Sequence, residues 1–115
     1  MSNEWILIGH LDESDCNLKK YNKTIGIYKA LLNNEIVYIG KATEYNNGGF
    51  RKRLRDYTRE NDSARLNNAG KNMNLYANEI IIEILIVESN EKGVKKANSL
   101  EKELIEKYKP KWNKL

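Results

Sequence analysis

Apolar residues recur along the chain with two different spacings, which separate predicted strands from predicted helices. The stretch from Glu79 to Glu88 is almost continuously apolar and predicts a central strand covered on both faces. Two runs rich in β-branched and aromatic residues, 25–28 and 35–40, flank the turn-forming pair Asn33-Asn34. Such an arrangement is typical of a β-hairpin, so we expect these two runs to pair as antiparallel strands.

Three further segments have the spacing of helices. Residues 50–59 predict a helix anchored by Leu54, and residues 62–75 predict a weaker one. Residues 93–108 repeat apolar side chains every three or four positions, and Pro110 follows where a helix must end. The elements therefore succeed one another in the order β-β-α-α-β-α.

Residues 1–24 are less informative than the rest. The run from Trp5 to Ile8 predicts either a strand or a flap over the core, and an acidic stretch followed by lysines comes next. We interpret residues 1–24 as an N-terminal extension that packs at the edge of a domain formed by residues 25–115.

The composition is that of an ordinary globular domain. The chain has 115 residues, of which 40% are hydrophobic and 31% charged, enough for one domain with one core. The formal net charge of +4 is a mild lean toward anionic partners. The longest apolar run is too short to span a bilayer, and no signal-peptide pattern opens the chain, so we expect no membrane partner and a cytoplasmic location.

Histidine and cysteine are scarce, which excludes several kinds of site. His10 is the single histidine and Cys16 the single cysteine. A Ser-His-Asp hydrolase, a two-histidine metal site and a four-ligand zinc site all need more of these residues or need them elsewhere. A disulfide framework is excluded for the same reason, and a reducing compartment fits.

The two predicted hairpin strands each carry a tyrosine beside a glycine. Side chains alternate between the faces of a strand, so Tyr28 and Tyr38 can point into one cleft while their apolar neighbours face the core. The alternative is that both are ordinary cross-strand aromatic residues. Neither interpretation is decided by the two strands alone.

A basic segment follows the hairpin and is the densest cluster of like charge in the chain. Arg53 and Tyr57 are four residues apart and share one face of the predicted helix. Another face carries three arginines. This second set comprises Arg51, Arg55 and Arg59. The cluster predicts phosphate binding, and the alternative is a solvated basic face.

Glu101 lies at the margin of the apolar stripe of the last predicted helix. A carboxylate placed there loses hydration unless it meets a cation or a metal. A single glutamate in a cleft suits Mg²⁺, which binds one or two carboxylates and keeps several waters. The alternative is an ion pair with Lys102 or Lys96 at the rim of the helix.

Taken together, these motifs resemble the GIY-YIG nuclease family. Both tripeptides that name the family are intact at 26–28 and 38–40, and Lys41 follows the second. An arginine with a tyrosine four residues on, Arg53 and Tyr57, comes next in the family's order. The segment from Leu100 to Asn113 is similar to the part of the family that carries its metal-binding glutamate and closing asparagine.

The resemblance implies a fold and a division of roles. The fold would be of the α+β class, with a small three-stranded antiparallel sheet flanked by helices. Glu101 would hold one Mg²⁺ or Mn²⁺ ion, and Arg53 would stabilise charge on the phosphate. One of Tyr28 and Tyr38 would accept the proton of the attacking water, with nearby cations lowering its pKa. Lys41 and Tyr57 would support this chemistry. The DNA contacts would come from Arg51, Lys52, Arg55, Arg59 and Asn113.

The implied function is a metal-dependent DNA endonuclease. The alternative is a non-catalytic nucleic-acid-binding module that keeps the fold. In size and in its Pro-Lys-Trp-Asn ending the chain is similar to the small phage-type endonuclease II and restriction-like members. One active site cuts one strand, so clean double-strand cleavage would call for a homodimer or a larger oligomer.

Overall fold

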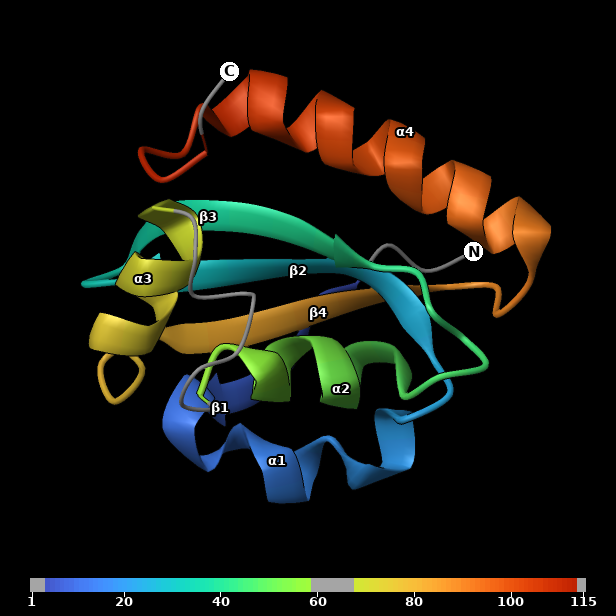
Figure 1. Ribbon diagram of the computed structural model, residues 1–115. Coiled ribbons are helices and arrows are strands. Elements are labelled where there is room, and N and C mark those ends of the chain that lie inside the picture. Colours follow the sequence, from blue (N-terminus) through green and yellow to red (C-terminus); the bar gives the residue numbers. More distant parts are fainter. Residues whose placement is uncertain (1–3, 59–67, 114–115) are drawn as a thin grey trace.

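A four-stranded antiparallel sheet with helices on both faces makes up the protein (Figure 1). The computed structural model describes residues 4–58 and 68–113. The N-terminal part contains β1, two 3₁₀ turns and a short helix. Its elements are β1 (Ile6–His10), η1 (Leu11–Glu13), α1 (Ser14–Asn17) and η2 (Lys19–Tyr21). The remaining elements are β2 (Ile25–Leu32), β3 (Glu35–Ala42), α2 (Gly49–Asp56), α3 (Asn68–Leu75), β4 (Ile81–Val87) and α4 (Glu91–Tyr108).

The strand order is β1-β4-β2-β3, which confirms the α+β class and an antiparallel sheet flanked by helices. The sheet has four strands instead of the expected three because β1 adds to the outer edge of β4, with Ile6 opposite Ile84. Pairing with both β1 and β2 places β4 inside the sheet, as its continuous apolar character predicts. At the other edge of the sheet lies β3.

A two-residue turn joins β2 to β3. Asn33 and Asn34 have φ angles of 54° and 65°, the left-handed backbone that the tightest hairpin turns need, and Leu32 pairs directly with Glu35 beyond them. Asparagine tolerates this conformation better than most residues. The Asn-Asn pair thus fixes the register that sets Tyr28 opposite Gly40.

Helix α4 covers one face of the sheet. Ala97 packs with Ile27, Leu85 and other apolar residues of β2, β3 and β4. At its start the Asn90 side chain accepts a hydrogen bond of 2.9 Å from the Gly93 amide, which caps the helix.

The other face is covered by α2 together with the N-terminal segment (Figure 1). Leu11 and Leu18 are 1% and 0% exposed and pack in one core with Phe50 and Leu54 of α2. Residues 4–24, predicted to pack at the edge, thus contribute a strand to the sheet and three buried apolar side chains to its core. The described residues contain no helix both long and apolar enough to cross a membrane.

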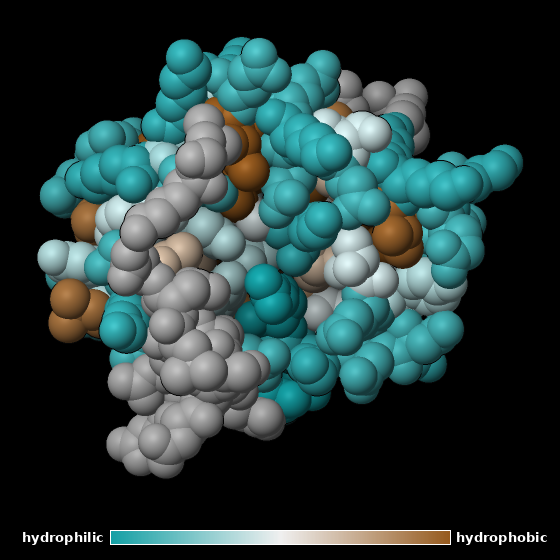
Figure 2. Space-filling model, turned by 45° about the horizontal axis from the view of Figure 1, so that its top comes forward, coloured by the Kyte–Doolittle hydropathy of each residue, from teal (hydrophilic) through white to brown (hydrophobic). Residues whose placement is uncertain are grey.

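The surface seen in Figure 2 is mostly hydrophilic, with hydrophobic residues in small separate spots. An arrangement of this kind suits a charged partner better than an apolar one. No large apolar patch stands out on that face.

Candidate active site

Three tyrosines from different elements meet below the hairpin. Tyr28 comes from β2, Tyr38 from β3, and Tyr57 directly follows α2. The hydroxyls of Tyr28 and Tyr57 lie 2.6 Å apart and form a buried hydrogen bond. The ring centroid of Tyr28 is 6.2 Å from that of Tyr38 and 6.2 Å from that of Tyr57. The structure thus brings together three residues that are predicted site residues.

The glycines of the two tripeptides make room for this cluster. A methyl group on Gly40 would stand 2.4 Å from the Tyr28 hydroxyl oxygen, closer than any side chain carbon can sit. On Gly26, whose φ is +151°, it would stand 1.9 Å from the backbone oxygen of Leu85. Both positions therefore require glycine. Gly26 allows β2 to lie close to β4, and Gly40 leaves space for the side chain of Tyr28.

Burial dominates the acidity of the phenols. It raises the pKa of Tyr28, which is fully buried, well above the ordinary value for tyrosine, and the neighbouring tyrosines add to the rise. The pKa of Tyr38 is raised as well, again chiefly by burial. Arg53 acts in the opposite, predicted direction on both groups but is outweighed. With the charges of the described residues alone, both phenols stay protonated at neutral pH.

Arg53 projects from α2 toward the tyrosines. Its guanidinium lies 5.8 Å from the centre of the Tyr57 ring. Interaction with Tyr28 is the largest influence on this guanidinium and raises the pKa of Arg53 further. The residue is exposed, so its charge is available to an incoming anion.

Two further predicted site residues, Glu101 of α4 and Lys41 of β3, lie side by side. The Lys41 ammonium donates a hydrogen bond of 2.6 Å to the Asn98 side-chain oxygen and lies 3.7 Å from a Glu101 carboxylate oxygen. Glu101 also contributes to raising the pKa of Tyr38, so its carboxylate is near that phenol. Lys41 of β3 is thus a partner of Glu101 from another element, which the alternative of an ion pair within the helix did not include.

A cleft of about 350 Å³ lies at the β3 edge, between α2 and α4, and the three tyrosines are not part of its lining. Its lining includes Lys41, Arg53 and Glu101 from three different elements. Glu44 and Asp56 also line it, and each forms an ion pair with Lys52. A second hollow, of about 500 Å³, lies against β1 and α1 and holds none of the predicted site residues.

The donor set of this cleft fits a magnesium ion with most of its water retained. Within residues 4–58 and 68–113, no group of three or more His, Cys, Asp or Glu side chains could enclose a metal. Glu101 presents one carboxylate, 21% exposed, to an open polar cleft, and its contact with Lys41 is long. One or two carboxylates are what Mg²⁺ usually takes from a protein, whereas zinc and calcium sites need more ligands.

The predicted DNA-contacting residues fall into different environments. Arg51 is bound to Asp15, and Arg55 is half-buried on the same face of α2. Arg59 lies outside the described residues. The Asn113 amide accepts from the Ile39 N–H at 2.9 Å and donates to the Ile39 carbonyl at 2.8 Å. Because the oxygen and the nitrogen of its side-chain amide both bond the backbone of β3, Asn113 holds the C-terminal tail in place and has no free group for DNA.

Sequence reasoning missed two partners of the predicted residues. Asn98 lies one helical turn before Glu101, and nothing in its spacing singles it out. Asp15 lies in the acidic stretch of the N-terminal segment and becomes notable only when α1 packs on α2. Both contacts join elements that are remote in the sequence.

Comparison with known proteins places this site in a family. A family model described as the UvrC-like GIY-YIG domain matches residues 24–114. No curated protein sequence matches the chain. The finer expectation, a likeness to the small phage-type endonuclease II and restriction-like members, is not confirmed by these matches.

Solved structures give the same relationship. The chain is similar to the GIY-YIG N-terminal endonuclease domain of UvrC from Thermotoga maritima bound to its catalytic divalent cation, magnesium. That match has 27% identity and a TM-score of 0.59, and covers 81% of this chain and 86% of that one. Two point-mutant forms of that domain, each bound to the catalytic divalent cation, are also similar. One has 26% identity and a TM-score of 0.59, and the match covers 86% of this chain and 97% of that one. The other has 28% identity and a TM-score of 0.57, and the match covers 81% of this chain and 86% of that one.

Proposed function

Because the chain belongs to the UvrC-like GIY-YIG domain family, we propose that it is a divalent-metal-dependent DNA endonuclease that hydrolyses phosphodiester bonds. One observation carries the proposal. Arg53, Glu101 and Lys41 come from three elements and line one cleft beside the buried tyrosines. Binding alone would need the basic residues, but it would not need a carboxylate and a phenol cluster at the same place.

Arg53 and Lys41 are assigned to the phosphate. Arg53 presents a planar, always-charged fork that can donate to two phosphate oxygens and stabilise their growing charge in the transition state. Lys41 is held by Asn98 and contributes a second positive charge at the cleft wall. The removal of one such donor typically slows an enzyme by about 10²–10³-fold.

Glu101 is the residue that would hold the Mg²⁺ or Mn²⁺ ion. When bound, the ion supplies positive charge to the scissile phosphate and to the neighbouring phenols. Mg²⁺ and Mn²⁺ both accept carboxylate and water oxygen as ligands. The similar UvrC domain is bound to magnesium, which supports this choice of ion.

Of the two candidate bases, Tyr38 is the one we assign to the attacking water. Tyr28 is fully buried, whereas Tyr38 is partly exposed and lies near Glu101. In its phenolate form, which the charge of Arg53 and of a bound divalent ion would favour, the Tyr38 oxygen would orient the water and take its proton. Tyr28 and Tyr57 hold Tyr38 and Arg53 in place through their packed rings and shared hydrogen bond.

Cleavage of supercoiled plasmid tests the proposal. Nicked or linear product should form with Mg²⁺ or Mn²⁺ and be absent with a chelator, and Glu101→Gln should abolish it with an unchanged circular dichroism spectrum. Glu106→Gln, an exposed glutamate on the same helix, is the matched control and should cleave normally. Salt-dependent DNA binding without any cleavage would support the non-catalytic module instead.

The product of that assay also bears on assembly. Nicked circles alone are expected from a monomer, whereas linear product formed directly is expected from a homodimer or larger oligomer. A cytoplasmic location stays a prediction.

A further inference from the structure

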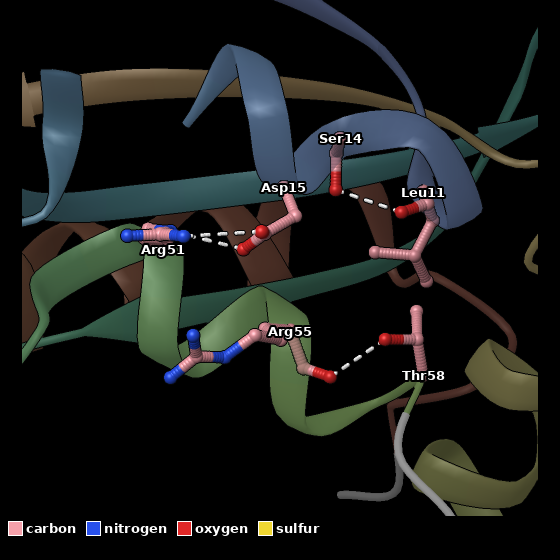
Figure 3. Close-up of polar contacts among 6 residues, drawn as sticks. All are labelled: Leu11, Ser14, Asp15, Arg51, Arg55 and Thr58. Carbon is pink, nitrogen blue, oxygen red and sulfur yellow. Dashed lines mark hydrogen bonds and ion pairs between the residues drawn. The ribbon is translucent and has the colours of Figure 1, made fainter. Parts of the chain in front are cut away.

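The face of α2 turned away from the cleft carries a positive cluster that is incompletely neutralised. Arg51 and Arg55 lie one turn apart on this face, about 6 Å along the helix. The Arg51 guanidinium forms two hydrogen bonds with Asp15 of α1, at 3.0 and 3.2 Å. In Figure 3 dashed lines reach the Arg51 guanidinium, and none reaches that of Arg55.

Arg55 is the unusual member of the pair. Its Nε atom is buried, and among the described residues no acceptor lies within hydrogen-bond distance of it. A buried guanidinium N–H without an acceptor is costly, and nearly all such groups are satisfied in native structures. The terminal nitrogens of this half-buried side chain are the atoms that an anion approaching α2 from solution would meet.

One carboxylate faces three cations here. Arg51 chiefly, and then Arg55 and Lys19, hold the pKa of Asp15 below its usual range. The cluster therefore keeps a surplus of positive charge after Asp15 has been counted. Lys19 is exposed, so part of this charge is open to a partner in solution.

The Asp15–Arg51 pair is also exchangeable. The two side chains are 46% and 27% exposed, and ion pairs exposed to this degree contribute little net stability. A phosphate offers the same two-oxygen geometry to a guanidinium as a carboxylate does. Asp15 belongs to α1, outside residues 24–114 that match the family model.

From this geometry we infer that Arg51, Arg55 and Lys19 form an accessory site for a DNA backbone phosphate, in which Asp15 occupies the place of the phosphate until DNA binds. The inference rests on the proposed function, since the DNA held here is the strand that continues past the cleft. The N-terminal segment thus adjusts affinity: its carboxylate competes with DNA for Arg51.

Salt-dependent binding of a duplex of about 20 base pairs, measured by fluorescence anisotropy with a chelator present, tests the inference over roughly 50 to 200 mM salt. Each lost phosphate contact should lower the slope of log K against log salt by about 0.9. Arg55→Gln should lower it by that amount, and Arg55→Lys, which keeps the charge, should retain most of the slope. Asp15→Asn should tighten binding about threefold at low salt and steepen the slope.

Glu13→Gln is the matched control for Asp15→Asn. It removes the same charge from the same segment, and among the described residues Glu13 has no ion-pair partner. Its effect on the slope should be smaller than that of Asp15→Asn. Equal effects of the two variants, or weaker binding by Asp15→Asn, would overturn the inference in favour of a purely structural ion pair.

DNA binding by the wild-type protein distinguishes a failure of this inference from a failure of the proposed function. If it shows no salt-dependent affinity for the duplex, the endonuclease proposal fails and the accessory site fails with it. If it binds, and the Arg55 and Asp15 variants match it in slope, the accessory site alone is wrong. Thermal melts of each variant confirm that binding is compared between folded proteins.

Discussion

Both faces of α2 carry arginines, but the surroundings of these arginines differ. On one face Arg53 stands over the Tyr57 ring and opens onto the cleft. On the other face Arg51 is held by Asp15 from the N-terminal segment. Helical spacing alone distinguishes the two faces but gives neither a role. The elements packed against each face decide which arginine opens onto the cleft and which is neutralised within the protein.

Replacing each arginine by lysine should give the largest difference between the faces. Lysine keeps the charge but loses the planar fork, so Arg53→Lys should slow cleavage by about 10²-fold or more. Arg51→Lys should leave the cleavage rate within about threefold of wild type, since Arg51 lies outside the cleft and contributes a single backbone contact. Single-turnover cleavage at saturating protein measures both. Equal losses would show that the faces are not functionally distinct.

Gly40→Ala tests how tightly the cleft face is built. The added carbon would stand 2.4 Å from the hydroxyl of Tyr28, which is 0% exposed and cannot move aside. Overpacking of this kind costs about 1–3 kcal/mol, which lowers the melting temperature by about 4–8 °C per kcal/mol. Cleavage should also fall, because Tyr28 and Tyr57 shift together. A variant with wild-type stability and activity would show that the phenol cluster is not rigid.

Local signals explain what the sequence predicted correctly. Alternating apolar residues around Asn33-Asn34 specify the hairpin, and the helical stripe with its proline stop specifies α4. These features depend on neighbours within a few residues. They also place Tyr28 and Tyr38 on one hairpin, so two members of the tyrosine cluster could be predicted from the sequence.

Contacts between distant segments could not be read in this way. The strand β1 is short, has a bulge between Leu7 and Gly9, and leaves Leu7 67% exposed, so its pattern is weak until β4 is there to pair with it. The Lys41–Asn98 and Arg51–Asp15 contacts span 57 and 36 residues. Burial of the phenols, which sets their acidity, likewise depends on the assembled core.

Alkaline pH should distinguish the buried phenols of the cleft face from the rest of the surface. In the unfolded chain tyrosine ionises near pH 10, whereas burial raises the pKa of Tyr28 in the folded protein. The folded state therefore keeps a proton that the unfolded state loses, and the stability fully present below pH 10 declines as the pH rises. The decline is at most about 1.4 kcal/mol per pH unit for each such tyrosine.

Chemical denaturation at a series of pH values measures this slope. Tyr28→Phe should be less stable than wild type at neutral pH, because the Tyr57 hydroxyl loses its 2.6 Å partner, yet its stability should fall less steeply above pH 10. Tyr108→Phe, at an exposed position on α4, is the control for an unrelated tyrosine. Parallel curves for wild type and Tyr28→Phe would contradict the raised pKa.

Loss of the Asp15–Arg51 ion pair should have the smallest effect on stability. Leu11 and Leu18 hold the N-terminal segment in the core independently of it, and the pair itself is partly exposed. Asp15→Asn, Arg51→Gln and the double variant should therefore each melt within a few degrees of wild type, and a double-mutant cycle should give a small coupling. A large coupling would mean that the pair is needed to dock α1, in which case a phosphate could not replace Asp15 without loosening the fold.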